Sequence, residues 1–120
     1  MIDDRRRFSR IPFHSTAHIY INGELYLNCP VIDVSLKGIL IEKPKHWSGQ
    51  IGDQYTLDLL LDDAQIVIKM TVTVAHQDTY HLGLECQTID VDSMTHLKRL
   101  LELNLGNSEL VHRELSALIH

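Results

Sequence analysis

The chain has little of what holds a small secreted domain together or crosses a membrane. Its 120 residues include two cysteines, Cys29 and Cys86, which are too few for a disulfide framework and lie outside any CxxC spacing. They are expected to be reduced core residues of a cytoplasmic protein. No apolar run approaches the ~18 residues of a membrane span. The charged N-terminus has no apolar stretch behind it, so neither membrane insertion nor a signal peptide is predicted.

The spacings of common metal and catalytic sites are also missing. Eight histidines form no HxH or HExxH pattern, and no cysteine stands at ligand spacing beside them. His14 and His18 are four residues apart, but in a strand this separates them by ~13 Å. There is no glycine-rich phosphate loop before a helix and no GxSxG motif. We therefore expect neither a metal site nor an enzyme.

Positive charge is concentrated at one end of an acidic chain. The net charge is −5, yet the first ten residues carry four arginines and two aspartates, a balance of +2 that leaves −7 for the remainder. The arginines are Arg5, Arg6, Arg7 and Arg10. Most of the surface would repel DNA or an anionic membrane. A small anion, approached by the basic arm, would not be repelled.

Alternating apolar and polar residues follow this arm and predict strands. Residues 17–21 have the period of a half-buried strand. Asn22 and Gly23 come next and are a strong signal for a two-residue hairpin. The return strand runs to Pro30, which removes a ladder donor and implies an edge, a bend or a bulge. Its alternating apolar residues, expected to share one face, are Leu25, Leu27 and Cys29.

Three later segments continue the strand pattern. Alternating residues 55–61 and 66–74 predict a hairpin that turns at Asp62 and Asp63, and a further strand follows at 80–86. The period then changes to that of an amphipathic helix. Its apolar stripe consists of Met94, Leu97, Leu101 and Leu105.

Helix ends can also be predicted. Asp92 is a plausible N-cap for the first helix, Gly106 should end it, and Ser108 can cap a second helix.

Together these patterns predict one mainly β domain with C-terminal helices. Six or seven short antiparallel strands followed by two helices favour a small β-barrel with a helical cover. We divide the domain into a basic arm (1–14), a barrel (15–89) and C-terminal helices (90–120). A monomer is expected, and helices that pair two chains are the alternative.

Residues 33–38, DVSLKG, carry polar groups that structure alone does not require. Asp33 and Ser35 are two apart on an extended segment, so their side chains should leave the same face, and Gly38 would let a ligand approach the backbone. A carboxylate can accept from the amide edge of guanine, and arginines can fork onto phosphate or guanine. The plain alternative is that Asp33 and Ser35 satisfy turn amides.

Arg6 and Arg10 form an RxxxR motif, and Asp33, Ser35 and Gly38 form a [D/N]xSxxG motif. This ordered pair resembles the PilZ domain, the bacterial receptor for cyclic di-GMP. The segments RRRFSRIPF and DVSLKGILIEKP, together with the C-terminal HLKRLLELNLG, are similar to small stand-alone PilZ proteins of gamma-proteobacteria. The resemblance covers essentially the whole chain.

The resemblance implies roles for individual residues. Arg6 and Arg10 would bind phosphates and guanine edges, Asp33 and Ser35 would hold a guanine, and Gly38 would permit its approach. The remaining candidate contacts are Arg5, Arg7 and His76. Arg5 favours binding of an intercalated pair of ligands. His76 stands where related proteins often have a stacking tryptophan.

We further expect an ordering switch, because the arm has few apolar anchors and its arginines repel one another. Ligand would fold the arm over the barrel and present a changed surface to a downstream effector protein. A PilZ-like interaction adaptor that binds no nucleotide is the main rival. A single-stranded RNA-binding barrel ranks third, because only 6% of residues are aromatic and the strands carry mostly acids.

Overall fold

The computed structural model describes residues 8–21, 23–61 and 65–119. In this part of the chain, strands precede two helices. The elements are β1 (Ile11–Pro12), β2 (Thr16–Ile21), β3 (Glu24–Val34), β4 (Gly38–Glu42), β5 (Gln54–Leu61), β6 (Ile66–Gln77), β7 (His81–Ile89), α1 (Val91–Leu105) and α2 (Ser108–Ile119).

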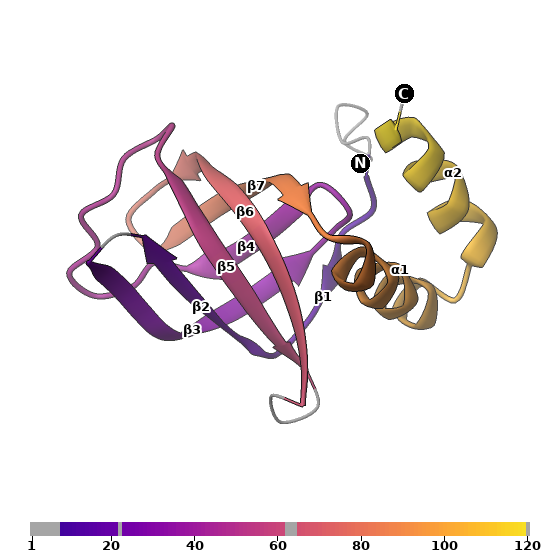
Figure 1. Ribbon diagram of the computed structural model, residues 1–120, viewed down its shortest axis with the longest axis horizontal. Helices are drawn as coiled ribbons and strands as arrows, with labels where there is room; N and C mark the ends of the chain where they lie inside the picture. The colour runs from indigo at the N-terminus through magenta and orange to yellow at the C-terminus, as the bar shows by residue number, and fades with distance from the viewer. Residues whose placement is uncertain (1–7, 22, 62–64, 120) are drawn as a thin grey trace.

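Six of these strands close into an antiparallel barrel. The order is β3-β2-β5-β6-β7-β4, and a further pairing of β3 with β4 closes the ring, while β1 pairs with the C-terminal end of β3. Figure 1 shows the barrel with both helices at one side of it, beside β1. The predicted fold class is confirmed.

The alternation in β5 and β6 fills the barrel as predicted. Residues 55, 57 and 59 of β5 are buried, as are residues 68, 70, 72 and 74 of β6. Leu61 pairs with Ile66 across the hairpin end. The predicted turn at Asp62 and Asp63 lies outside the described residues.

The first hairpin is confirmed, but the predicted face of its return strand is wrong. Ile21 pairs with Glu24, and Gly23 has the positive φ that such a turn requires (78°); Asn22 lies outside the described residues. Leu25 and Leu27 are 60% and 57% exposed, and only Cys29 is buried.

A β-bulge accounts for this change of face. Asn28 adopts a left-handed φ of 53°, and the register of β2 against β3 shifts between Ala17 and Ile19. The backbone N–H of Asn28, displaced from the ladder, donates to Nδ1 of His18 at 3.1 Å. One extra residue reverses the alternation, so Cys29 points inward although Leu27 points outward. The bulge lies two residues before Pro30, where an irregularity was predicted.

Both helices begin earlier in the sequence than predicted. The N-cap of α1 is Asp90, not Asp92, because the Asp90 carboxylate accepts from both the N–H (2.7 Å) and the Oγ (3.0 Å) of Ser93. In α2, Oδ1 of Asn107 accepts from the N–H of Leu110, so Asn107 replaces Ser108 as the cap. Gly106 ends α1 with a left-handed φ of 65°, as predicted.

Helix α1 is fastened to the barrel at its first turn. The N–H of Lys69 in β6 donates to Oγ of buried Ser93 at 3.0 Å. Leu97 and Leu101 are fully buried and belong to the same core cluster as the strands. Neither helix within the described ranges is long and apolar enough to cross a membrane.

Replacing Asp90 by alanine is expected to lower the melting temperature by a few degrees, because the N–H and the Oγ of Ser93 both lose their acceptor at the first turn of α1. Asp92→Ala is the matched control, since it removes an acidic side chain from the same turn without removing the cap. Thermal unfolding followed by circular dichroism measures both variants. An equal decrease for the two would contradict the assignment of Asp90 as the cap.

Candidate functional site

A groove of about 220 Å³ lies where the β3–β4 and β6–β7 hairpins meet. Five predicted site residues line it: Arg10, Asp33, Ser35, Gly38 and His76. The predicted residues Arg5, Arg6 and Arg7 lie outside the described residues. The other residues that line the groove are Lys37, Ile39, Leu40, Ala75, Gly83, Leu84 and Glu85.

A bulge in β3 directs Asp33 to the groove. Val31 pairs with Ile41 and Asp33 pairs with Leu40, so one residue of β3 has no counterpart on β4. As a result, Val31 and Val34 both point into the core although they are three residues apart. Without the extra residue, Asp33 would share the face of Val31 and face the apolar interior.

Ser35 and Gly38 build the turn beside Asp33. Oγ of Ser35 accepts from the N–H groups of Lys37 (3.1 Å) and Gly38 (3.2 Å), and the Ser35 N–H donates to the Gly38 carbonyl (2.9 Å). Ser35 is 8% exposed. These bonds match the turn-forming alternative, and direct ligand contact by Ser35 stays a prediction.

Gly38 also has a structural reason to be glycine. A Cβ there would lie well inside contact distance of the backbone carbonyl oxygen of Leu84 on β7. The close approach that Gly38 permits in this structure is therefore between β4 and β7.

His76 faces the groove because of another bulge. The register of β6 against β7 shifts between Val74 and His76, so Ala75 and His76 are both exposed after the buried Val74. Gly83 pairs with His76 on one side and with Leu40 on the other. A Cβ on Gly83 would lie 3.0 Å from Cβ of His76, so the missing side chain leaves room for the histidine and lowers the groove floor.

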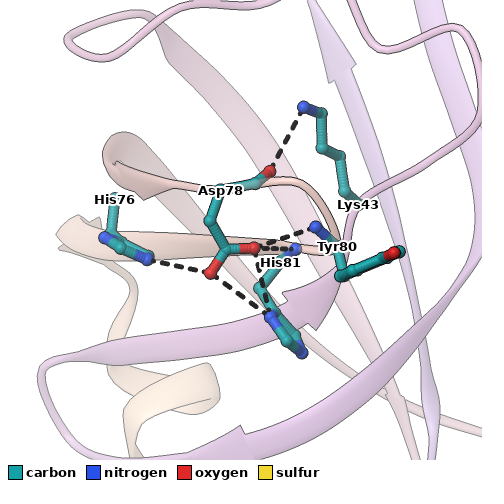
Figure 2. A network of polar contacts seen from close by, with 5 residues as sticks. All are labelled: Lys43, His76, Asp78, Tyr80 and His81. Atoms are coloured by element: carbon teal, nitrogen blue, oxygen red, sulfur yellow. Dashed lines mark hydrogen bonds and ion pairs between the residues drawn. The ribbon is translucent and has the colours of Figure 1, made fainter.

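Figure 2 shows the polar network that surrounds Asp78 in the β6–β7 turn. Nε2 of His76 lies 3.3 Å from the Asp78 carboxylate, and Nδ1 of His81 lies 3.2 Å from it. The N–H groups of Tyr80 (2.9 Å) and His81 (2.8 Å) donate to the same carboxylate, and Nζ of Lys43 donates to the Asp78 carbonyl. The Tyr80 N–H is the main reason that the pKa of Asp78 lies well below its ordinary value. Asp78 therefore holds one edge of the His76 ring.

Replacing Asp78 by asparagine is expected to lower the melting temperature at neutral pH and progressively less in acid. A carboxyl whose pKa is depressed by folding stabilises the folded chain above its ordinary pKa, and this stabilisation is lost as the pH falls towards the folded value. The gap between wild type and Asp78→Asn should therefore narrow below about pH 4. Melting curves between pH 7 and pH 3 test this, and a constant gap would argue against the depressed pKa.

Arg10 is held against the barrel by its neighbours. Phe8 is half-buried against the core, and Ile11 is 3% exposed and pairs with Val34. The N–H of Phe13 donates to the carbonyl of Ile32 at 3.1 Å. The last part of the predicted arm is thus anchored, and β1 lies within it. The hypothesis of an arm that orders on binding is restricted to residues 1–7, which lie outside the described part.

The groove combines groups suited to a nucleotide. Arg10 and Lys37 supply positive charge, Asp33 and Glu85 supply carboxylate acceptors, and His76 supplies an aromatic ring. Among the described residues, no group of three or more histidine, cysteine or acidic side chains is arranged to hold a metal ion.

Three residues in or beside the groove were not predicted from the sequence. Lys37 lies inside the DVSLKG motif and could have been included as a second cation beside Arg10. Glu85 is brought to the groove by pairing with Gly38, which depends on strand order. Asp78 acts through His76 and has no motif of its own.

The chain belongs to the PilZ domain family, because the model of that family matches residues 4–103. The resemblance drawn from the two motifs is thereby confirmed. PilZ domains are receptor or adaptor domains, and no catalytic family is indicated.

Solved structures share this fold. The Bacillus subtilis inhibitor of motility MotI/DgrA has a TM-score of 0.71 and 19% identity, over 87% of this chain and 51% of its own. K. pneumonia MrkH, in its apo state and as a c-di-GMP complex, has TM-scores of 0.58 and identities of 17% and 21%, over 88% of this chain and 52% and 55% of MrkH. An uncharacterised Legionella protein has a TM-score of 0.50 and 13% identity, over 79% of this chain and 91% of its own. The chain spans about half the length of MotI/DgrA and MrkH.

Proposed function

We propose that this PilZ domain is a receptor that binds cyclic di-GMP in the groove. The observation that carries the proposal is that Arg10, Asp33 and His76, which are distant in sequence, line one groove. Membership of the PilZ family and the fold shared with MrkH, which was solved as a c-di-GMP complex, add support.

Each groove residue has a role that suits its chemistry. The Arg10 guanidinium forks onto a phosphate or onto the O6/N7 edge of guanine. The Asp33 carboxylate accepts from the N–H donors of a guanine, which adenine does not present in the same pattern. Ser35 and Gly38 act chiefly by shaping the turn that presents Asp33 and Lys37.

The arginines before Phe8 complete the proposal. Arg6 forms the RxxxR motif with Arg10, and Arg7 is a further contact. Arg5 recruits the second molecule of an intercalated pair by binding its phosphates. Residues 1–7 become ordered over the groove, and the resulting surface of arm, ligand and barrel rim is recognised by a downstream effector protein.

The receptor is further proposed to act as a monomer in the cytoplasm. Cys29 and Cys86 are free, and free cysteines persist in a reducing compartment. Burial raises the pKa of Cys29 to about 11, which keeps its thiol protonated and unreactive.

Isothermal titration with cyclic di-GMP tests the proposal, with cyclic di-AMP and GTP as controls. We expect selective binding at micromolar affinity or tighter, with a ratio near two per chain. A ratio near one would keep the receptor and discard the intercalated pair. Equal binding of cyclic di-AMP would contradict the guanine assignment. No binding of any of the three would favour the interaction adaptor.

Replacing His76 by alanine is expected to weaken cyclic di-GMP binding by about three- to tenfold, because stacking of a base on an aromatic ring contributes roughly 1–3 kcal/mol and imidazole is the smallest such ring. Asp78→Asn should produce a smaller loss, because it loosens the ring without removing it. Titration of both variants measures the effect. An unchanged affinity for His76→Ala would remove His76 from the site.

A further inference from the structure

Helix α2 is tied to the segment that carries Arg10. The backbone N–H of Ser9 donates to both carboxylate oxygens of Glu114, at 3.0 and 3.1 Å, and Oγ of Ser9 donates to Oε2 at 2.6 Å. The two residues are 105 positions apart. This set of bonds joins the segment before β1 to helix α2.

Glu114 is a charged residue at a buried position of α2. It is 8% exposed, the least exposed of the charged residues in the described part of the chain. A buried carboxylate is costly unless donors satisfy it, and in this structure Ser9 supplies three bonds. The position of α2 and the position of Ser9 therefore depend on each other.

Ser9 directly precedes Arg10 and lies inside the RxxxR motif. Beyond Arg10, Ile11 is fixed by pairing with Val34. The backbone of Arg10 is thus held from both sides, by Glu114 before it and by β3 after it. Without the Glu114 bonds, the chain before Arg10 is held by the packing of half-buried Phe8 and no longer by hydrogen bonds at Ser9, so the Arg10 guanidinium samples more positions over the groove.

We propose that Glu114 is a positioning residue for Arg10, so that docking of α2 sets the affinity of the groove for its phosphate-bearing ligand. The inference rests on the proposed function for its effect on affinity. Its structural part, control of the Arg10 backbone by Glu114, can be measured without ligand.

Three variants and a control separate the contributions. Glu114→Ala removes every bond to Ser9 and is expected to weaken cyclic di-GMP binding by about tenfold, the effect of losing one charge-assisted set of bonds. Glu114→Gln can still accept from the Ser9 N–H and donate to its Oγ, so its affinity should return to within about threefold of wild type. Ser9→Ala keeps the backbone bonds and should behave similarly. Glu109→Ala, an exposed glutamate on the same helix, should have no effect.

The Arg10→Ala background distinguishes positioning from a general loss of stability. If Glu114 acts through Arg10, Glu114→Ala should weaken binding in the wild type but add almost nothing once Arg10 is alanine. Equal losses in the two backgrounds, or an affinity of Glu114→Ala equal to wild type, would overturn the inference. A Glu114→Gln variant as weak as Glu114→Ala would also overturn it.

Hydrogen exchange of the ligand-free protein supplies the independent measurement. In Glu114→Ala, amides of residues 9–11 should exchange faster than in wild type and in Glu109→Ala, while amides of β5 and β6 stay protected. Unchanged exchange at residues 9–11 would refute the positioning role. The two proposals can fail separately. If the wild type binds no cyclic di-GMP but residues 9–11 exchange faster in Glu114→Ala, the proposed function is rejected, while control of the Arg10 backbone by Glu114 is retained.

Discussion

Replacement of Arg10 by alanine is expected to weaken cyclic di-GMP binding by about ten- to a hundredfold while leaving thermal stability unchanged. A bidentate arginine contact contributes roughly 1–3 kcal/mol, and each 1.4 kcal/mol is a factor of ten in affinity. The Arg10 side chain is exposed at the groove, so its removal leaves no cavity in the core. Isothermal titration and a melting curve on the same sample measure both quantities.

Two further variants sharpen this experiment. Arg10→Lys keeps the charge without the planar fork and should give an intermediate affinity. Arg99→Ala removes an exposed arginine from α1 and serves as the control for net charge. An equal loss in Arg99→Ala would show that the arginine acts only through long-range attraction, and wild-type affinity in Arg10→Ala would show that Arg10 takes no part in binding.

Replacement of Gly38 by alanine is expected to lower the free energy of unfolding by about 1–3 kcal/mol and to abolish measurable binding. The new methyl group would overlap the backbone carbonyl oxygen of Leu84, and backbone cannot move aside as a side chain can. Strand β4 must then shift away from β7, and the groove lies across that pairing. Chemical denaturation and titration measure the two effects.

Gly83→Ala is the matched control, because its new methyl group would lie 3.0 Å from Cβ of His76, a much milder contact than the overlap at Gly38. Its loss of stability should be clearly smaller. A Gly38→Ala variant with wild-type stability but without binding would instead support the original hypothesis, in which Gly38 serves to admit the ligand.

Sequence periodicity was sufficient to predict the buried face of an element wherever the chain follows one regular pattern. The buried faces alternate without interruption along β5 and along β6 as far as Val74, and α1 places Leu97 and Leu101 on one stripe, so these faces were predicted correctly. The clustering of Arg10, Asp33 and His76 was expected from the family resemblance.

Irregular backbone marks the limit of such prediction. Three of the register shifts between the described strands, near Asn28, between Val31 and Asp33 and between Val74 and His76, each insert a residue that reverses the alternation. The pattern alone therefore assigned Leu25 and Leu27 to the wrong face. The same kind of irregularity directs Asp33 and His76 to the groove, so the site depends on the feature that periodicity cannot reveal. Glu114 was missed because its partner lies at the other end of the chain.

The place of the groove on the β4–β7 pairing has a consequence for how the chain folds. β3 with β4, and β6 with β7, pair as hairpins between neighbours in sequence, whereas β4 meets β7 only after a long loop of chain has closed. Pairings of this kind carry the larger entropic cost and slow the folding of β proteins. Asp33 and His76 belong to different hairpins and come together only in the closed barrel. A ligand held between them would therefore stabilise the completed barrel over every partly folded form, and would slow its opening at this pairing first.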